Sequence, residues 1–322
     1  MHALFITALQ QALEGTALTA AQAAALIGLL PEHTLDLLAV ARVMASTSRA
    51  APFTCGIINA KSGRCAENCR FCAQSMHHAT QAPAYPLVSR DTLLVQAERF
   101  AGEGAAYMGI VTSGTGPVGR DFDALCHAAA YITARVDIKL CASFGILTAA
   151  QAVALKQAGY ASCHHNIETA RSHYPAICTT HGFDARIRTV RNAQAAGLRV
   201  CSGGIFGLGE SWAQRIEMAA ELGELQVDSV PVNFLTPIPG TPLENSPPLP
   251  PGEALGLLAL LRLMLPGRDI VVCGGRAATL REWQNLVFSA GANGIMVGDY
   301  LTTPGSALEH DRAMLRTLGL RP

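Results

Sequence analysis

The sequence predicts an α/β protein, a (β/α)8 TIM-type barrel with an N-terminal helical extension. Two observations lead to this prediction. After residue 52, eight short apolar stretches alternate with amphipathic helical stretches, as in parallel βαβ units. Before residue 49, the chain shows only helical patterns. Eight repeats favour a closed barrel, with active-site groups at the carboxyl ends of the strands, over a doubly wound open sheet.

The N-terminal extension is predicted to hold three helices. Thr19 to Gln22 has the form of a capping box ahead of an apolar run. Pro31 stops that helix, and a further helix is predicted from about Thr34 to Ser46. Ala51-Pro52 then breaks the helical pattern. The predicted domains are therefore an extension over residues 1–50 and a barrel over residues 51–322.

The eight predicted strands are short apolar runs, as buried parallel strands usually are. They lie at 53–59, 106–112, 136–143, 161–167, 198–206, 228–234, 269–275 and 294–298. Every gap between them holds a plausible helix, for example over 89–104 or 184–197. The Pro- and Gly-rich segment 237–251 is predicted to be a long loop after the sixth strand, where a loop could cover a substrate.

Composition argues against two classes of partner. The 24 Lys and Arg residues balance the 24 Asp and Glu residues, so the chain lacks the excess positive charge that is typical of nucleic-acid-binding proteins. The mean hydropathy is +0.26, but no uncharged apolar run approaches the roughly 18 residues that a spanning helix needs. The best candidate, 254–265, contains Arg262 and is stopped by Pro266. The N-terminus lacks the features of a secretory signal. We expect a cytoplasmic protein with no nucleic-acid or membrane partner.

The strongest sign of chemistry is a cysteine triplet, Cys65, Cys69 and Cys72, in the loop after the first predicted strand. Ten cysteines in 322 residues are too few for a disulfide scaffold and favour metal binding or catalysis. Three close thiolates can hold three irons of a [4Fe–4S] cluster and leave the fourth iron open to a small molecule. A zinc site would need a fourth protein ligand, which does not occur at the usual spacing. A reduced surface loop is the other alternative.

This triplet resembles the motif of the radical S-adenosylmethionine (SAM) superfamily, in which the open iron binds SAM and the cluster cleaves it to a 5′-deoxyadenosyl radical. Phe71 also matches the aromatic residue that this superfamily commonly has just before the last cysteine, and we expect it beside the cofactor. The resemblance narrows to the biotin synthase family from about residue 55 onward. The matching stretches are Asn59–Ser75, His165–Thr169, Val200–Glu210, Ser229–Leu235, Gly240–Leu243, Ala290–Gly298 and Leu301–Pro304.

The resemblance implies a reaction and its partners. Dethiobiotin would be the substrate, and sulfur would be inserted between two of its unactivated carbons. Such carbons resist acid–base chemistry, so a radical abstractor is chemically necessary. The resemblance also implies a reducing electron donor such as flavodoxin or ferredoxin, and a homodimer.

Strand parity assigns faces to the residues around 161–168, because alternate residues of a strand point to the same side. His164, Asn166 and Glu168 share one face, whereas Cys163 and His165 share the other. The resemblance makes the first set inward-facing. It implies that Glu168 contacts the SAM amino group and that His164 and Asn166 lie near the substrate ureido ring, with Asn166 also among the cofactor-binding residues. We expect His165 to be an ordinary packed histidine and Cys163 to lie outside the lumen.

Parity along 53–61 brings Lys61 to the mouth of the site, where we expect it to contact substrate. By resemblance, Asn233 contacts the ureido group, and Thr302 and Thr303 hold the substrate carboxylate. Arg186 matches an arginine near SAM, with a helix-surface arginine as the alternative.

The glycine-rich stretch around Gly204 and Gly207 would let the backbone approach the nucleoside part of SAM. A phosphate-binding loop is the weaker alternative, because glycines alone are a poor signal.

The sequence departs from the family at its second cluster, a sacrificial [2Fe–2S] cluster held by three cysteines and an arginine. Cys141 and Cys201 match two of these ligands. The other cysteine position falls near Gly109, and the arginine position falls on Val271. The usual ligand set is therefore incomplete.

Two additional cysteines, Cys55 and Cys273, stand on other predicted strands, and Cys273 shares a face with Val271. The four cysteines all lie on odd-numbered strands, and alternate strands of a barrel contribute to one interior layer. The sequence therefore predicts an auxiliary Fe–S cluster at Cys55, Cys141, Cys201 and Cys273, of a four-iron type and not [2Fe–2S], that carries the sulfur to be donated. The alternative is four buried cysteines of an ordinary core.

Two further functions stay open at this point. One is another radical SAM enzyme of the same subfamily, a methylornithine-synthase-like mutase or a hydrogenase-maturase-like protein without sulfur transfer. The other is a non-catalytic iron–sulfur or zinc scaffold. Cys126 and Cys178 are interpreted as ordinary cysteines without a ligand role.

Overall fold

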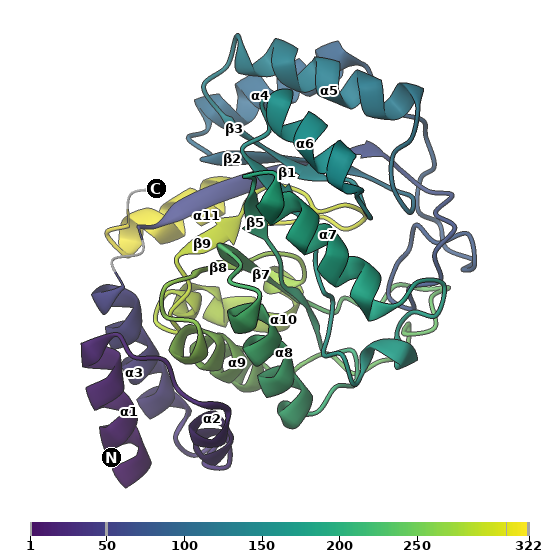
Figure 1. The fold of residues 1–322 in the computed structure, drawn as a ribbon. Coiled ribbons are helices and arrows are strands. Elements are labelled where there is room, and N and C mark those ends of the chain that lie inside the picture. The colour runs from purple at the N-terminus through teal and green to yellow at the C-terminus, as the bar shows by residue number, and fades with distance from the viewer. Residues whose placement is uncertain (1, 49–50, 307, 321–322) are drawn as a thin grey trace.

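The computed structural model describes residues 2–48, 51–306 and 308–320, and its centre is a closed parallel barrel (Figure 1). Its first strand pairs with the second at one edge and with the last at the other, which closes the sheet. The strands are β1 (Phe53–Lys61), β2 (Tyr107–Thr112), β3 (Lys139–Ser143), β4 (Ser162–His164), β5 (Arg199–Cys201), β6 (Gly204–Phe206), β7 (Ser229–Phe234), β8 (Asp269–Val272) and β9 (Gly294–Met296).

β5 and β6 together form one barrel strand. Cys201 on β5 pairs with Ser229, and Gly204 on β6 pairs with Val232, so both pieces run in the same register along β7. The barrel therefore has the eight strand positions that the sequence predicts, and the predicted (β/α)8 fold is confirmed.

Helices follow the strands and cover the outside of the barrel (Figure 1). Several begin at the residues that the sequence favours: Thr148 and Ser211 each form a capping box with a glutamine three residues later. The helices are α4 (Arg90–Gly102), α5 (Arg120–Thr133), α6 (Ala149–Gln157), α7 (Phe183–Ala195), α8 (Trp212–Glu224), α9 (Pro251–Met264), α10 (Arg276–Leu280) and α11 (Leu308–Thr317), with 3-10 turns at Tyr174–Ala176 and Arg281–Val287.

The N-terminal extension consists of α1 (Ala3–Glu14), α2 (Ala20–Ile27) and α3 (Thr34–Thr47). The predicted capping box is confirmed: the Gln22 N–H donates to Thr19 Oγ1 at 3.3 Å, and the Thr19 N–H donates to Gln22 Oε1 at 2.9 Å. The domain boundary predicted at residue 50 lies outside the described residues, so the division into domains stays a prediction.

Helix α9 explains the apolar run at 254–265. It packs against the barrel and also against α2 and α3 of the extension, so every residue from Ala254 to Met264 is buried. The charged Arg262 is fully buried in this run. Its Nε donates to the Gly291 carbonyl at 2.7 Å, and its Nη1 donates to the Pro266 carbonyl at 2.8 Å. These bonds offset the cost of burying the guanidinium.

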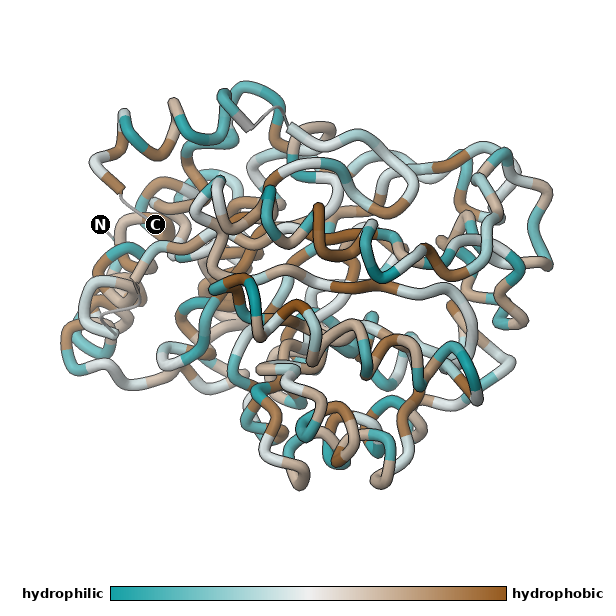
Figure 2. The backbone as a smooth tube through the Cα atoms, turned by 90° about the horizontal axis from the view of Figure 1, so that it is seen from above, coloured by the Kyte–Doolittle hydropathy of each residue, from teal (hydrophilic) through white to brown (hydrophobic). Residues whose placement is uncertain are grey.

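Most hydrophilic segments lie on the outside of the barrel and helices, although some charged residues such as Arg262 are buried. Figure 2 shows hydrophobic segments through the middle of the molecule and hydrophilic segments on its outer turns and loops. In the described part of the chain, none of the helices is both long enough and apolar enough to cross a membrane.

Candidate active site

One cavity of about 420 Å³ occupies the barrel lumen and reaches the loops at the carboxyl ends of the strands. Inward-facing strand residues and the segments that follow β1, β2, β3, β4, β7, β8 and β9 contribute to its wall. The sequence-predicted residues on this wall are Cys55, Cys65, Cys69, Phe71, Cys72, Cys141, His164, Asn166, Glu168, Arg186, Cys201, Asn233, Cys273, Thr302 and Thr303. The fold thus brings together side chains from distant parts of the chain.

The cysteine triplet lies in the loop that follows β1. The backbone of this loop is closed on itself, because the Met76 N–H donates to the Cys65 carbonyl at 2.8 Å and the Cys72 N–H donates to the Cys69 carbonyl at 3.0 Å. Burial raises the pKa of the Cys72 thiol to about 11. The free Cys72 thiol is therefore protonated at neutral pH, and binding a metal would release that proton.

The triplet fits an iron–sulfur cluster better than a single ion. In the described residues, the compact group of three ligand atoms within 4.8 Å of one another is a different one, Cys69, Cys178 and His181. The triplet Cys65, Cys69 and Cys72 does not form such a group. Three soft thiolates with a wider spread suit a cluster of several irons.

A hydrogen-bonded ion pair lies beside the triplet. Arg186 Nη1 donates to Glu168 Oε1 at 3.2 Å and to the Asn166 carbonyl at 2.9 Å, and its Nε donates to the Tyr174 hydroxyl at 2.7 Å. Burial raises the pKa of Glu168, against the opposing effect of Arg186. Burial alone would lower the pKa of Arg186, but Glu168 and Tyr174 outweigh it and raise that pKa. Arg186 is 7% exposed, so the alternative of a helix-surface arginine is wrong.

The backbone at Glu168 is held in an unusual conformation. Its φ is +70°, which a side chain larger than glycine adopts only at a cost of about 1 kcal/mol. The neighbouring strand keeps it there: the Ile205 N–H donates to the Glu168 carbonyl at 2.9 Å. Gly204 permits this close approach, because a Cβ at that position would lie 2.2 Å from the same carbonyl oxygen. The strain directs the Glu168 carboxylate to Arg186 on the cavity wall.

The predicted glycine contacts have a packing explanation. Position 204 requires glycine because a Cβ there would clash with the Glu168 carbonyl. Position 207 favours glycine because its φ is +91°. Neither is among the residues that line the cavity. Their contact with SAM stays a prediction.

The residues expected to contact substrate come from three strands and their loops. Asn233 on β7 is fixed in place: its Nδ2 donates to the Gly204 carbonyl at 3.1 Å, and its Oδ1 accepts from the Gly274 N–H at 2.9 Å. Burial lowers the pKa of His164 to about 4, so its imidazole is neutral at physiological pH. Thr302 and Thr303 follow β9 at the mouth of the cavity.

Lys61 does not follow the parity argument. The pairing of β1 with β2 shifts between Asn59 and Lys61, which is a β-bulge, and a bulge turns the following side chains away from strict alternation. Lys61 Nζ instead donates to Asp121 on α5 at 2.6 Å, and Lys61 is not among the residues that line the cavity. The expected position of Lys61 on the wall is thus corrected, and its contact with substrate stays a prediction.

Four further cysteines face the same lumen from the strands β1, β3 and β5 and from the residue after β8. Contact with Cys55 and burial raise the pKa of Cys273 well above its ordinary value. Burial raises the pKa of Cys141 to about 12. The pKa of Cys201 is also raised, by burial and by the nearby thiols of Cys141 and Cys55. The four thiols thus line one cavity, but no three of their sulfur atoms lie within 4.8 Å of one another, so a shared cluster stays a prediction.

The positions that depart from the family also fall on this wall. Gly109 pairs with Cys141, and a Cβ at Gly109 would lie 3.0 Å from Ile57 Cγ2. Val271 lines the cavity without a polar group. Cys163 lies in the hydrophobic core at 1% exposed and does not line the cavity, so its predicted position outside the lumen is confirmed.

Sequence reasoning missed Arg199. Its side chain lines the cavity, is paired with Asp269, and its guanidinium carbon lies 5.6 Å from the centroid of the Tyr107 ring. Its charge opposes the burial that raises the pKa values of Cys141 and Cys201. Strand parity could have found it, because it stands two residues before Cys201 on the same face.

His165 is packed as expected, at 5% exposed, but it also reaches the cavity wall. Its Nε2 is buried and has no hydrogen-bond partner. Burial lowers its pKa well below the ordinary value, with a further contribution from Arg186.

Two protein-family models match the chain. Residues 60–222 match the Radical SAM superfamily, and residues 231–321 match the Biotin and Thiamin Synthesis associated domain. Together they span most of the barrel, including the cysteine triplet and the Asn233 and Thr302 regions.

Curated proteins with high sequence identity to this chain are named biotin synthase. The chain is 56% identical to the biotin synthase of Nitratidesulfovibrio vulgaris (strain DP4) over 305 residues, which covers 94% of this chain and 84% of that protein. It is 52% identical to the biotin synthase of Geotalea uraniireducens (strain Rf4) over 269 residues, which covers 83% of this chain and 82% of that protein.

Solved structures share the fold. A methylornithine synthase superposes with a TM-score of 0.85 at 20% identity and covers 98% of this chain and 97% of its own. The FeFe-hydrogenase maturase of Carboxydothermus hydrogenoformans gives a TM-score of 0.82 at 17% identity, with 98% of this chain and 78% of its own covered. At these identities the likeness shows the fold alone.

Proposed function

This chain belongs to the biotin synthase family within the radical SAM superfamily, and on this premise we propose which of its residues serve the reaction. Its activity is the insertion of sulfur into dethiobiotin, which forms the thiophane ring of biotin, so it is a radical SAM sulfurtransferase. It works with a [4Fe–4S] cluster, with SAM and with an external reductant.

One observation carries the residue assignments: a single cavity joins the cysteine triplet, the polar residues expected to contact substrate, and four further cysteines. The triplet follows the carboxyl end of β1, whereas the four others lie on the strands or directly after them. When bound, the SAM cluster supplies a carbon radical, and an auxiliary cluster supplies sulfur. Dethiobiotin would lie between these two sets of thiols.

We assign the ends of SAM by charge. The Glu168 carboxylate, held by Arg186 at 3.2 Å, is the acceptor that a SAM ammonium needs. Asn166 Nδ2 donates to the second carboxylate oxygen of Glu168 at 3.3 Å and fixes its plane. Cys65, Cys69 and Cys72 would hold the cluster, and Phe71 beside them would contact the cofactor.

We assign the substrate by its two polar ends. The ureido ring would meet Asn233, whose amide is already oriented by Gly204 and Gly274, and the neutral His164. A neutral imidazole can both donate and accept, as a ureido group requires. The hydroxyls of Thr302 and Thr303 would hold the carboxylate at the mouth of the cavity.

We propose that Cys55, Cys141, Cys201 and Cys273 hold an auxiliary cluster of a four-iron type. The usual two-iron ligand set lacks its cysteine at Gly109 and its arginine at Val271, whereas four thiols line one lumen. Four thiolates offer one ligand to each iron of a four-iron cluster. Arg199 supplies a positive charge beside this anionic group.

The alternative enzyme without sulfur transfer has support only from the fold it shares with the two solved structures. Flavodoxin or ferredoxin as the reductant, a homodimer, and a place in the cytoplasm remain proposals that rest on resemblance and composition.

The test is anaerobic reconstitution of the parent chain and of a Cys55→Ala/Cys273→Ala variant, followed by Mössbauer spectroscopy, iron counting and assay of biotin from dethiobiotin. We expect about eight irons in the parent and about four in the variant, with loss of biotin. The matched control is Cys126→Ala/Cys163→Ala, because both of these thiols lie away from the cavity wall. About four irons in every chain, with SAM cleaved and no biotin formed, would contradict the auxiliary cluster.

A further inference from the structure

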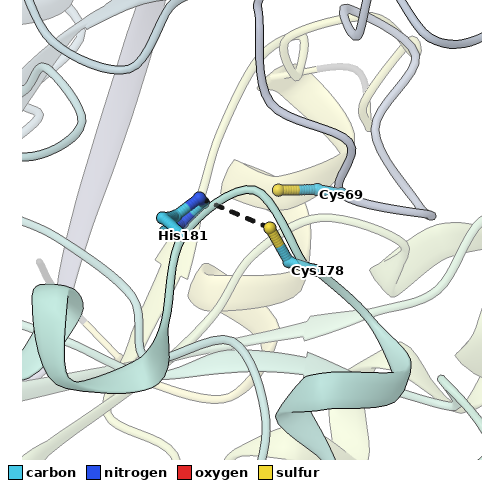
Figure 3. A group of neighbouring side chains, drawn as sticks. All are labelled: Cys69, Cys178 and His181. Carbon is cyan, nitrogen blue, oxygen red and sulfur yellow. Dashed lines mark hydrogen bonds between the residues drawn. The ribbon is translucent and has the colours of Figure 1, made fainter.

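A second group of metal-ligating side chains lies behind the cysteine triplet. The ligand atoms of Cys69, Cys178 and His181 all lie within 4.8 Å of one another (Figure 3). Cys178 Sγ is 3.3 Å from His181 Nδ1, and the Cys69 and Cys178 thiols contact each other. Cys178, interpreted from the sequence as ordinary, is thus a neighbour of an expected cluster ligand.

Hydrogen bonds hold the two loops of this group together. Asn68 lies in the triplet loop, and its Nδ2 donates to Thr179 Oγ1 at 2.6 Å. Its Oδ1 accepts from the Thr179 N–H at 3.0 Å. The Arg70 N–H donates to the Ile177 carbonyl at 3.0 Å. Cys69 on one loop and Cys178 on the other are therefore fixed in contact without any metal.

The spacing of the group matches one ion. In a tetrahedral zinc site, a sulfur ligand and a nitrogen ligand lie about 3.6 Å apart, and two sulfurs lie about 3.8 Å apart. The Cys178–His181 separation of 3.3 Å is close to the first value. Cys178 is 4% exposed and Cys69 is 8% exposed, so an ion there would be shielded from water.

Glu67 hydrogen-bonds the histidine of this group. Its Oε2 lies 2.7 Å from His181 Nδ1, but Glu67 does not belong to the group whose ligand atoms all lie within 4.8 Å of one another. We propose that the chain without its clusters binds one soft divalent ion, Zn²⁺ or Fe²⁺, through Cys69, Cys178 and His181, and that a water molecule takes the fourth position. Both sulfurs bind as thiolates, so any proton that they carry is released, and no electron is transferred.

The proposed site excludes the SAM cluster. Cys69 belongs to both ligand sets, so an ion held with Cys178 and His181 withholds Cys69 from the triplet. Cys178 does not line the cavity, whereas Cys69 and His181 do. The ion would therefore sit at the edge of the cavity. Zinc bound there would slow assembly of the cluster.

The test measures Zn²⁺ affinity in the full-length, cluster-free chain by competition with a chromophoric chelator. All chains carry Cys55→Ala/Cys141→Ala/Cys201→Ala/Cys273→Ala, which removes the four competing thiols of the lumen. We expect Cys178→Ser and His181→Ala each to weaken Zn²⁺ binding by roughly tenfold or more, as loss of a ligand should. Cys72→Ser should leave the affinity within about threefold, because Cys72 is outside the group.

Two results would overturn the site. One is a loss of affinity in Cys72→Ser with none in Cys178→Ser, which would place the ion on the triplet. The other is a zinc anomalous-scattering peak in crystals of the background chain that lies away from Cys178 and His181. Replacement of zinc by Fe²⁺ in the same competition tells which ion the site prefers.

A second readout covers the chance that a variant fails to fold. Zinc added before reconstitution should lower iron uptake at the triplet in the background chain and should not do so in folded Cys178→Ser. The affinity measurement uses neither SAM nor dethiobiotin, so its failure is distinguishable from failure of the proposed function. Equal zinc inhibition in both chains would also contradict the site.

Discussion

Arg186 donates to the carboxylate of Glu168 at 3.2 Å on the wall of the cavity, and both side chains are withdrawn from solvent. Loss of one partner of a buried ion pair leaves the other charge unpaired, which costs about 3–5 kcal/mol. The pair therefore contributes to stability, and under the proposed assignment it also serves cofactor binding.

Arg186→Gln should unfold at a lower denaturant concentration than the parent chain. In the cluster-loaded chain it should also bind SAM at least tenfold more weakly, as measured by equilibrium dialysis. The physical reason is that the pKa of Glu168, already raised by burial, rises further without the guanidinium, so less of the carboxylate is ionised. Arg188→Gln, on the exposed side of the same helix, is the control. Unchanged SAM affinity in Arg186→Gln would remove this pair from the cofactor site.

Gly204→Ala should be destabilised by about 1–3 kcal/mol, because the new Cβ would lie 2.2 Å from the Glu168 carbonyl oxygen and one of the strands must shift. Urea unfolding measures this. Gly182→Ala provides the comparison, since a Cβ at Gly182 meets no atom within 4 Å. Equal stability of the two variants would show that the strands near Glu168 are not tightly packed.

Arg199→Gln should lose iron from the auxiliary cluster while it keeps the SAM cluster. Removal of the cation leaves the thiolates of Cys141 and Cys201 less stable in a buried place. After reconstitution, iron should fall from about eight toward about four per chain, and SAM should still be cleaved. Arg191→Gln, which changes an exposed arginine on α7, should retain all the iron. Full iron retention in Arg199→Gln would argue against a role for this charge.

Asp311→Asn should destabilise the chain by about 3–5 kcal/mol. Asp311 on α11 accepts from Arg276 Nη2 at 2.8 and 2.7 Å, and both side chains are fully buried. The double variant Arg276→Met/Asp311→Leu should be more stable than the single variant, because it leaves no unpaired charge. Thermal unfolding of the two variants checks the order, and the reverse order would contradict it.

Stability should fall between pH 7.5 and 5.5, in part because of His165. Its pKa is well below 6.5 in the folded chain, so the unfolded chain binds the proton first as the pH falls. The folded state therefore loses stability as the pH drops below the unfolded value, by up to about 1.4 kcal/mol for one histidine over this interval. Urea unfolding of His165→Gln at the two pH values should show a smaller loss, and an equal loss would contradict the assignment.

Much of the fold follows from local patterns in the sequence. Apolar runs and amphipathic stretches alternate eight times, and the capping residues Thr19, Thr148 and Ser211 begin helices as local chemistry predicts. The cysteine triplet is equally local, because its three ligands stand within eight residues. Parity correctly put Cys163 outside the lumen and His164 on its wall, but it failed for His165, which also reaches the wall because the strand ends at His164.

The tertiary structure decided what depends on contacts between distant segments. A bulge at the end of β1 turned Lys61 toward Asp121, and no sequence pattern marks that bulge. Burial of Arg186 and the position of Arg199 follow from closure of the barrel, which brings separate strands to one lumen. Cys69 and Cys178 lie close together because the two loops that carry them are joined by hydrogen bonds between Asn68 and Thr179. The sequence by itself determined the elements and the kind of chemistry, because these rest on short-range periodicity and residue type. Only packing determined which side chains share a site, because those distances span the whole chain.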